Sequence, residues 1–290
     1  MPTFTSSRKA PVVRPAAGTA AVSVRGVTKR FGRGPVVLDD VSLDVAPGEF
    51  VCLLGASGCG KSTLLNLIAG LDEPTRGQVS VLGHRPALMF QEPALYPWLT
   101  AAQNIELALR LRGVGRSSRR SEAARLLELV RLDGSGGKRP HELSGGMRQR
   151  VALARALAQD SQVLLMDEPF ASLDAITRDL LHDELTRIWQ EVGVTIVFVT
   201  HNVREAVRLG QRVVLLSSRP GRVAQQYPID IGQPRRIESP DVAEIAVRIT
   251  DDLSREIRKH AHAPAQVGAA GAPPQPVPAQ SGAARQETSS

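Results

Sequence analysis

The sequence predicts an α/β fold with a parallel central sheet, an antiparallel β subdomain and an inserted helical subdomain. Four runs are almost continuously apolar, as strands are when helices cover both faces of a parallel sheet: 50–54, 162–166, 194–199 and 212–216. Three others alternate apolar and polar residues, which is typical of half-buried antiparallel strands: 21–27, 38–45 and 79–82. From about 93 to 160 apolar residues recur at three-and-four spacing, which predicts helices that no buried strand interrupts.

We expect one folded domain at residues 21–263, with the helical subdomain at about 93–160. The individual helices are predicted at 101–111, 121–132, 146–159 and 176–191. Both ends of the chain differ in composition, because residues 1–20 are rich in Pro, Ala, Ser and Thr, and residues 264–290 in Ala, Pro, Gly and Gln. Such segments bury too little apolar surface to fold, so we expect two disordered tails.

The composition is that of an ordinary globular protein with an excess of basic residues. The net charge is +7, which invites a nucleic-acid partner, but only 3% of the residues are aromatic and we find no zinc-finger or RNP spacing. We therefore expect no nucleic acid as partner. A solvated basic face near anionic lipid explains the arginines better, including the cluster Arg110, Arg112, Arg116, Arg119 and Arg120.

The sequence shows no segment that would place the chain in or across a membrane. No apolar run is long enough to span a bilayer, and the basic, proline-containing N-terminus has no continuous hydrophobic region of the signal-peptide kind. We therefore expect the protein to stay in the cytosol.

A glycine-rich stretch, GASGCGKST, lies between the apolar run 50–54 and a helical pattern at 64–68. Glycines allow the tight turns with which backbone N–H groups surround a phosphate, the lysine adds a positive charge, and the serine offers a hydroxyl to Mg²⁺. A helix that begins there directs its positive dipole end at the same anion. Nine residues are therefore expected to bind a nucleotide: Gly55, Ala56, Ser57, Gly58, Cys59, Gly60, Lys61, Ser62 and Thr63.

Cys59 lies at the start of this predicted helix. Because a helix N-terminus favours a thiolate, we expect an alkylating reagent to modify Cys59 and bound nucleotide to protect it.

The run 162–166 ends in two carboxylates, Asp167 and Glu168. Ligands bind at the carboxyl ends of parallel strands, so both carboxylates are expected beside the phosphate loop if the strands 50–54 and 162–166 are neighbours. Asp167 would then hold Mg²⁺, and Glu168 would orient or deprotonate an attacking water. An acidic pair that closes a strand is also common at loop starts, and the upstream phosphate loop favours the catalytic interpretation.

A second helix start follows in HELSGGMRQRVALARAL, where Ser144 is the expected N-cap ahead of Gly145 and Gly146. Its exposed N-terminus is suited to a second anion. This stretch resembles the signature motif of the ATP-binding-cassette (ABC) ATPases, and the chain resembles that family from about residue 22 to 231. The family usually has Gln at the fifth motif position, which Met147 occupies here, so that only a side-chain contact is expected to differ.

The resemblance implies a P-loop NTPase core of the RecA-like kind that binds ATP and Mg²⁺ through its Walker A and Walker B motifs. It implies a homodimer in which the signature of one subunit closes over the nucleotide held by the other. By the same resemblance Gln91 contacts Mg²⁺ and the attacking water, and Asp174 crosses the dimer interface. Phe31 matches the aromatic that stacks on adenine, with a core phenylalanine as the alternative, and His201 matches the histidine that contacts the γ-phosphate and positions Glu168, with a polar strand cap as the alternative.

Four longer stretches of the sequence resemble the nitrate, sulfonate and taurine branch of importers, and most of all the aliphatic-sulfonate importers: FQEPALYPWLTAAQNI, LSGGMRQRVALARAL, DEPFASLDAITR and LLSSRPGRV. This implies two separate integral-membrane permease subunits, an extracytoplasmic solute-binding protein, and a peripheral location at the cytoplasmic face of the membrane. Tyr96 and Trp98 are expected to face the permease, or else to pack the helical subdomain. The alternatives are an importer of another small solute and a non-transport P-loop ATPase.

Overall fold

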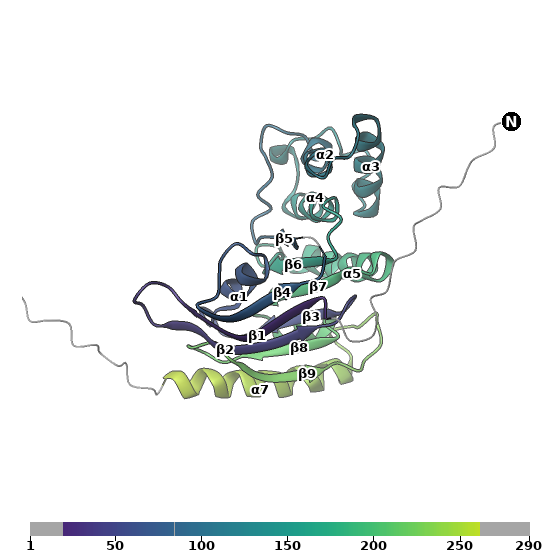
Figure 1. Ribbon diagram of the computed structural model, residues 1–290. Helices are drawn as coiled ribbons and strands as arrows, with labels where there is room; N and C mark the ends of the chain where they lie inside the picture. Colours follow the sequence, from purple (N-terminus) through teal and green to yellow (C-terminus); the bar gives the residue numbers. More distant parts are fainter. Residues whose placement is uncertain (1–19, 84, 262–290) are drawn as a thin grey trace, which may run out of the picture.

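The computed structural model describes residues 20–83 and 85–261, which form two sheets and the helices around them (Figure 1). The tails predicted at 1–20 and 264–290 lie outside the described residues, apart from Ala20. Among the described helices, none has the length and apolar character needed to cross a bilayer.

The larger sheet has six strands in the order β5-β6-β7-β3-β8-β9. Its four central strands are parallel to one another and confirm the four apolar runs: β3 (Phe50–Leu54), β6 (Val163–Asp167), β7 (Thr195–Thr200) and β8 (Arg212–Leu216). Each edge carries one further strand that the sequence pattern did not predict. These are β5 (Ala87–Met89), parallel to β6, and β9 (Val223–Pro228), antiparallel to β8.

The smaller sheet is antiparallel, as its alternating pattern predicted. Its strands are arranged in the order β2-β1-β4, with bounds β1 (Val22–Arg30), β2 (Val36–Val45) and β4 (Arg76–Val81). One face of this sheet packs on the central sheet and the other is exposed, which explains the alternation.

Three helices form the helical subdomain at one end of the molecule, and a long helix lies at the opposite end (Figure 1). The three are α2 (Ala101–Leu111), α3 (Arg116–Leu129) and α4 (Gly145–Leu157), with a short 3₁₀ turn at Pro140–Glu142 before α4. The others are α1 (Lys61–Ile68), α5 (Ala175–Val192), α6 (Val203–Leu209) and the long α7 (Pro240–Ala261). The start predicted for α3 at 121 was wrong, because its first turn is largely solvated arginine and serine and carries no apolar period.

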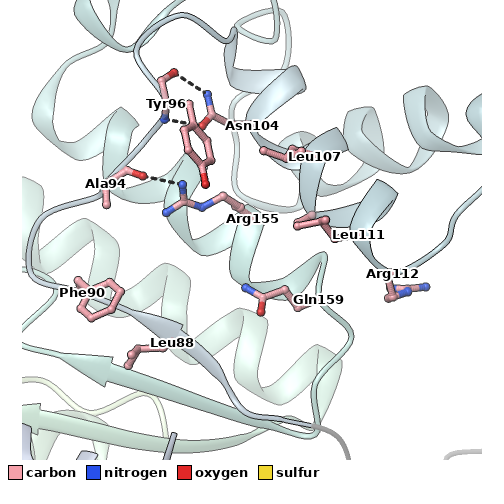
Figure 2. Close-up of a pocket in the computed structure, with 11 residues that line it drawn as sticks. Leu88, Phe90, Ala94, Tyr96, Asn104, Leu107, Leu111, Arg112, Arg155 and Gln159 are labelled. Carbon is pink, nitrogen blue, oxygen red and sulfur yellow. Dashed lines mark hydrogen bonds between the residues drawn. The ribbon is translucent and has the colours of Figure 1, made fainter. Parts of the chain in front are cut away.

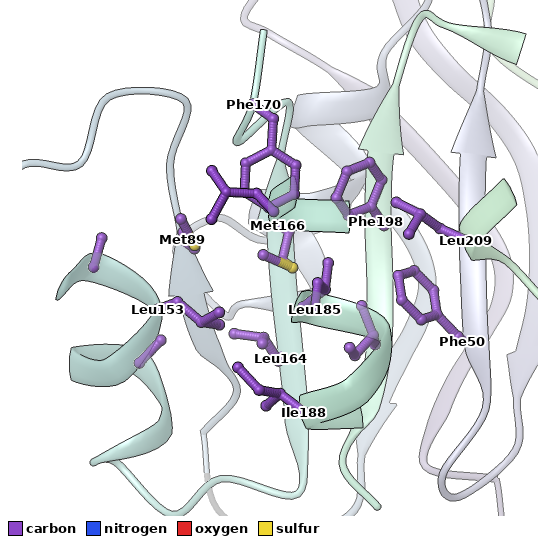
Figure 3. Packing of buried hydrophobic residues seen from close by; sticks show 14 of the residues in the cluster. Phe50, Met89, Leu153, Leu164, Met166, Phe170, Leu185, Ile188, Phe198 and Leu209 are labelled. Carbon is purple, nitrogen blue, oxygen red and sulfur yellow. The ribbon is translucent and has the colours of Figure 1, made fainter. Parts of the chain in front are cut away.

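The central strands are buried on both faces, and alternate side chains enter two different cores. Phe50 and Phe198 point toward α4, α5 and α6, where Met166 and Phe170 join them (Figure 3). Val51 and its neighbours point the other way, toward α1 and the antiparallel sheet. Burial of both faces explains why these strands read as continuous apolar runs.

The carboxyl ends of β3, β6 and β7 meet at one edge of the sheet. The condition that β3 and β6 are direct neighbours was wrong, since β7 lies between them. Registers Leu54 to Thr200 and Val199 to Asp167 nevertheless align the three strand ends side by side. Parallel strands place their ends at the same edge whatever their order, so the loops after these strands share one site.

Candidate functional site

The phosphate loop at 55–63 has a backbone that only glycine accommodates at its two sharpest bends. Gly58 has φ +75° and Gly60 has φ +102°, in the left-handed region that side chains disfavour. A Cβ at Gly60 would lie 2.6 Å from the Leu38 side chain. Gly60 caps α1, whose first turn has no side-chain cap, so the backbone N–H groups at this helix start are open to an anion.

Lys61 is buried beneath the loop and tied to it. Its Nζ donates to the carbonyl oxygens of Gly55 at 2.9 Å and Ala56 at 3.0 Å, while the loop tip at Ser57 and Gly58 is exposed. A buried ammonium held by two carbonyls is a charge fixed under the place where phosphates would lie. Ser62 is exposed and Thr63 half-buried in the first turn of α1.

The expectation of a reactive thiolate at Cys59 was wrong. The side chain is only 1% exposed, and its burial raises the pKa of the thiol above the ordinary value, which outweighs the lowering by the Lys61 charge. Its sulfur lies 2.6 Å from the position that a Cβ at Gly55 would occupy. Cys59 is therefore a small packing residue inside the loop, and its thiol is protonated at neutral pH.

Two carboxylates lie beside the loop at the end of β6. Burial is the main cause that raises the pKa of Asp167; the nearby Ser62 hydroxyl and the Lys61 charge oppose it, and the neighbouring charge of Glu168 adds to it. Glu168 has φ +45°, a conformation that is strained for this residue, and its N–H donates to the Val199 carbonyl at 3.0 Å. The strained backbone directs the Glu168 side chain out of the strand end toward β7.

Glu168 and His201 form a pair across this edge. The Oε2 atom of Glu168 lies 2.8 Å from Nδ1 of His201, which follows β7. The His201 side chain is 59% exposed, so its other ring nitrogen is accessible to a ligand. The interpretation of His201 as a mere strand cap is therefore the weaker one, because its partner is the carboxylate proposed to be catalytic.

Behind this pair lies a buried network that the sequence did not reveal. Glu205 of α6 bonds to Nε2 of His182 at 2.6 Å and also accepts from the Thr200 hydroxyl, next to His201 in the chain. Thr200 Oγ1 in turn accepts from the N–H of Asn202 at 2.9 Å. His182 has no metal-ligand spacing and Glu205 follows no motif weighed above, so only the fold brings them together.

The signature segment begins a second helix, α4. Ser144 is exposed and caps the helix, its Oγ accepting from the Met147 N–H at 3.3 Å. A Cβ at Gly146 would lie 2.6 Å from Thr177 Cγ2 in α5, and Asp174 caps α5 by accepting from the Thr177 N–H at 2.9 Å. The two predicted interface segments are thus adjacent.

Within the described chain, no hydrogen bond or ion pair joins Ser144–Met147 to the phosphate loop. The structure therefore places the predicted site residues in two separate groups, one around Lys61 and one around Ser144.

Phe31 and Gln91 lie on the exposed surface. Phe31 is 52% exposed and the Lys29 ammonium lies 4.7 Å from its ring centroid, so the alternative of a core phenylalanine was wrong. Gln91 is exposed as well, and its carbonyl accepts from the Gln149 amide in α4 at 2.8 Å. This bond ties the segment after β5 to the signature helix.

A cavity of about 500 Å³ lies between that segment and α2 (Figure 2). Arg155 closes one side by donating to the carbonyls of Pro93 and Ala94, and Asn104 bonds to both backbone groups of Tyr96. Several large apolar side chains remain exposed at or near its rim: Phe90, Tyr96, Trp98 and Leu111.

The part of the chain that the structure describes contains no cluster of three or more His, Cys, Asp or Glu side chains that would hold a metal ion by themselves. A divalent cation would need further oxygen ligands, such as those of a bound triphosphate.

Comparison with known proteins gives a consistent set of relatives. Residues 38–171 match the family model described as ABC transporter. The aliphatic sulfonates import ATP-binding protein SsuB of Bacillus subtilis is 44% identical over 245 residues, which cover 81% of this chain and 95% of that protein. The taurine import ATP-binding protein TauB of Burkholderia pseudomallei is 46% identical over 234 residues, which cover 76% of this chain and 90% of that protein.

A solved structure with the same fold is the dimeric post-hydrolysis state of the ATP-binding cassette MJ0796 bound to ADP and Pi. It matches with a TM-score of 0.62 and 33% identity, over 73% of this chain and 100% of that chain.

Proposed function

Because this chain belongs to the ABC transporter family and is an ATP-hydrolysing subunit of it, we propose that it energises the import of aliphatic sulfonates or taurine through separate permease subunits. The observation that supports the catalytic part of this proposal is the pair of Glu168 and His201 at 2.8 Å, beside the phosphate loop. The substrate class is supported by the names of the relatives, since the contacts to the solute lie on other subunits.

ATP, the substrate of the proposed reaction, binds at the phosphate loop. Lys61 and the open N–H groups of 55–63 bind its phosphates, and Phe31 stacks on the adenine. Ser62 and Asp167 fit Mg²⁺, because the two side chains lie near each other and a hydroxyl and a carboxylate are oxygen ligands that this cation takes. Bound Mg²⁺ neutralises charge on the phosphate oxygens.

Glu168 is the general base in the proposed reaction. It accepts a proton from the attacking water while the water oxygen bonds to the γ-phosphorus and the bond to the β-phosphate oxygen breaks. His201 holds Glu168 through Nδ1 and presents its other nitrogen to the γ-phosphate. Gln91, on the exposed segment after β5, completes the site around the water and Mg²⁺.

The second half of each site comes from a second copy of the chain. Ser144, Gly145 and Gly146 bind the γ-phosphate of ATP held by the partner subunit, and Asp174 crosses the same interface. The solved structures of the similar cassette MJ0796 are dimeric, which supports the proposed dimer. ATP then joins two subunits, and hydrolysis releases them.

The cavity beside Gln91 is the proposed contact with the permease. It is supported by the exposed Tyr96 and Trp98, whose rings lie 5.5 Å apart, and by Leu111, which is 82% exposed. The alternative that Tyr96 and Trp98 pack the helical subdomain is disfavoured by their exposure. The subunit would lie at the cytoplasmic face of the membrane, and an extracytoplasmic binding protein would deliver the solute to the two permeases.

The test is growth of a strain of the source organism that lacks the gene, with an alkanesulfonate, taurine or sulfate as sole sulfur source. We expect the deletion strain to grow on sulfate but not on at least one of the two organic sources. The wild-type gene should restore growth on that source, and the Glu168→Gln gene should not. Normal growth of the deletion strain on both organic sources would assign the importer to another small solute. Failure of the tagged protein to co-purify with any polytopic membrane protein would instead favour a non-transport P-loop ATPase.

A further inference from the structure

The turn between β8 and β9, residues 217–222, is fixed to strand β2. The N–H of Gly221 donates to the Val37 carbonyl at 2.8 Å, and the N–H of Asp39 donates to the Gly221 carbonyl at 3.0 Å. The guanidinium of Arg222 forms an ion pair with the Asp39 carboxylate. One side of the turn therefore extends the sheet whose β1–β2 loop carries Phe31.

The other side of the same turn presses on the phosphate loop. A Cβ at Gly221 would lie 2.2 Å from the Cys59 carbonyl oxygen, so that only glycine fits there. Two residues earlier, Arg219 lies over Gly58: its Nε donates to the Gly58 carbonyl at 3.4 Å, and its Nη2 is 2.7 Å from where a Cβ of Gly58 would be. The guanidinium thus covers the exposed tip of the loop.

The turn is braced internally. Its buried Ser217 donates from Oγ to the Pro220 carbonyl at 2.9 Å and accepts from the Arg222 N–H at 2.9 Å. The Ser217 N–H also donates to the Arg222 carbonyl at 2.9 Å. These bonds hold Arg219 and Gly221 in fixed positions relative to each other, so a contact at one is transmitted to the other.

We propose that the turn at 217–222 is a brace that preorganises the nucleotide site, with Arg219 as a positioning residue that acts on ATP binding through Gly58. The brace joins the loop that holds the phosphates to the sheet that carries Phe31, and therefore fixes the distance between the two ends of the nucleotide site. Gly58, at φ +75°, has wide backbone freedom, and the Arg219 plane removes part of that freedom before ATP arrives. The inference rests on the proposed binding of ATP by this loop.

The experiment measures the Kd of a non-hydrolysable ATP analogue, and kcat and KM of hydrolysis, for Arg219→Ala, Arg219→Lys and the control Arg120→Ala, an exposed arginine on α3. We expect Arg219→Ala to raise Kd and KM by about tenfold, because the variant loop loses conformational entropy when it becomes ordered around ATP. Once ATP is bound the loop is ordered, so kcat at saturating ATP should stay within about twofold of wild type. Lysine keeps the charge but not the planar cover, so Arg219→Lys should resemble Arg219→Ala. Arg120→Ala should resemble wild type.

A second pair of variants tests the other contact of the brace. Gly221→Ala places a methyl group against the Cys59 carbonyl, whereas Gly232→Ala meets nothing within 4 Å and is the matched control. We expect Gly221→Ala to raise Kd at least as much as Arg219→Ala, and Gly232→Ala to leave it unchanged.

The outcomes separate this inference from the proposed function. A wild-type protein that does not bind ATP overturns both. A wild-type protein that binds and hydrolyses ATP while Arg219→Ala has an unchanged Kd overturns the brace alone. Full recovery in Arg219→Lys, or a fall in kcat with KM unchanged, would also overturn it, because either would assign Arg219 a role in charge or catalysis instead of positioning.

Discussion

The phosphate loop and the signature segment each precede a helix, α1 and α4, but the chain treats the two helix starts differently. At α1 the helix N–H groups have no side-chain cap, but the chain itself fixes the loop before them: Lys61 is buried and bonded to the loop, and Arg219 and Gly221 contact it from outside. At α4 the Ser144 hydroxyl caps the helix and Ser144 is exposed, whereas Gly146 is buried against Thr177 of α5. The first helix start is thus open to an anion, whereas the second is capped and no hydrogen bond or ion pair joins it to the phosphate loop in the described chain.

In the proposed function a single subunit holds the phosphate loop together with Glu168 and His201, and the signature segment of a partner subunit completes the site. Glu168, His201 and Lys61 lie together, whereas Ser144 and Asp174 lie together elsewhere. In the proposed dimer, substitutions in the first group act within one chain, and substitutions in the second group act only between chains.

The largest expected effect is that of Glu168→Gln, which removes the proposed base without removing a phosphate contact. Hydrolysis should fall by about 10²- to 10⁴-fold, the range for loss of a general base, while ATP binding is retained. Because the ATP that joins the subunits persists, gel filtration with MgATP should show a stable dimer. Hydrolysis at the wild-type rate would remove Glu168 from its role.

Lys61→Ala and Ser144→Asp should separate the two helix starts. Loss of the Lys61 charge should raise the Kd of ATP for the single subunit by about 10- to 100-fold, as expected for a charge-assisted contact. Aspartate is itself a good N-cap, so Ser144→Asp preserves α4 but repels a partner's γ-phosphate. It should bind ATP normally by calorimetry yet fail to dimerise or hydrolyse, with Ser144→Asn as the uncharged control. Weakened ATP binding in the Ser144→Asp monomer would place the signature within the same chain's site.

Asp167→Asn should stabilise the fold while it impairs catalysis. Burial raises the pKa of Asp167 in the folded protein, so ionisation of this group opposes folding as the pH rises from its unfolded to its folded pKa. At neutral pH the nucleotide-free variant should therefore melt about 2 °C higher than wild type, and the difference should vanish in acid where both forms are uncharged. A lower melting temperature at neutral pH would contradict the assignment of burial as the dominant cause.

The smallest expected effect is that of Met147→Gln, which introduces the residue usual in the family. Met147 is half-buried against the core of the helical subdomain, and the helix start next to it is made of backbone groups and Ser144. Hydrolysis should change by less than about threefold, the scale of one exposed hydrogen bond. A larger change would mean that the signature acts through this side chain.

Much of this architecture was predictable because its signals are local. The continuous apolar runs, the glycine spacing of the phosphate loop and the cap at Ser144 are each dictated by neighbouring residues. Edge strands β5 and β9 escaped prediction because one is only three residues long and the other is mostly exposed and polar. Helix α7 does carry apolar residues at helical spacing, Val242, Ala246, Ile249 and Leu253, so a signal for it was present.

Non-local features were out of reach. In the central sheet β7 lies between β3 and β6, and the residue pattern of a strand does not indicate which strands are its neighbours. Arg219 contacts Gly58 across 161 positions of the chain, and His182 meets Glu205 only because α5 and α6 lie against each other. The environment of Cys59 also depended on packing, which is why burial prevailed over the helix terminus in setting the pKa of its thiol.

The most direct test of the divided site is to mix two defective chains, one carrying Lys61→Ala and the other Ser144→Asp, at an ATP concentration that leaves the Lys61→Ala site largely empty. In a mixed dimer one site combines both substitutions, while the other joins an intact phosphate loop to an intact signature. Neither variant should pair with itself through ATP, whereas the one intact site joins the two different chains. Equal mixing should therefore restore hydrolysis, up to about half of the wild-type rate when every chain is in a mixed dimer with one intact site of two. As the control, a single chain that carries both substitutions should show no restored hydrolysis, because none of its dimers has an intact site. A mixture as inactive as its two components would contradict the account, because it would show that each nucleotide site is built within one chain.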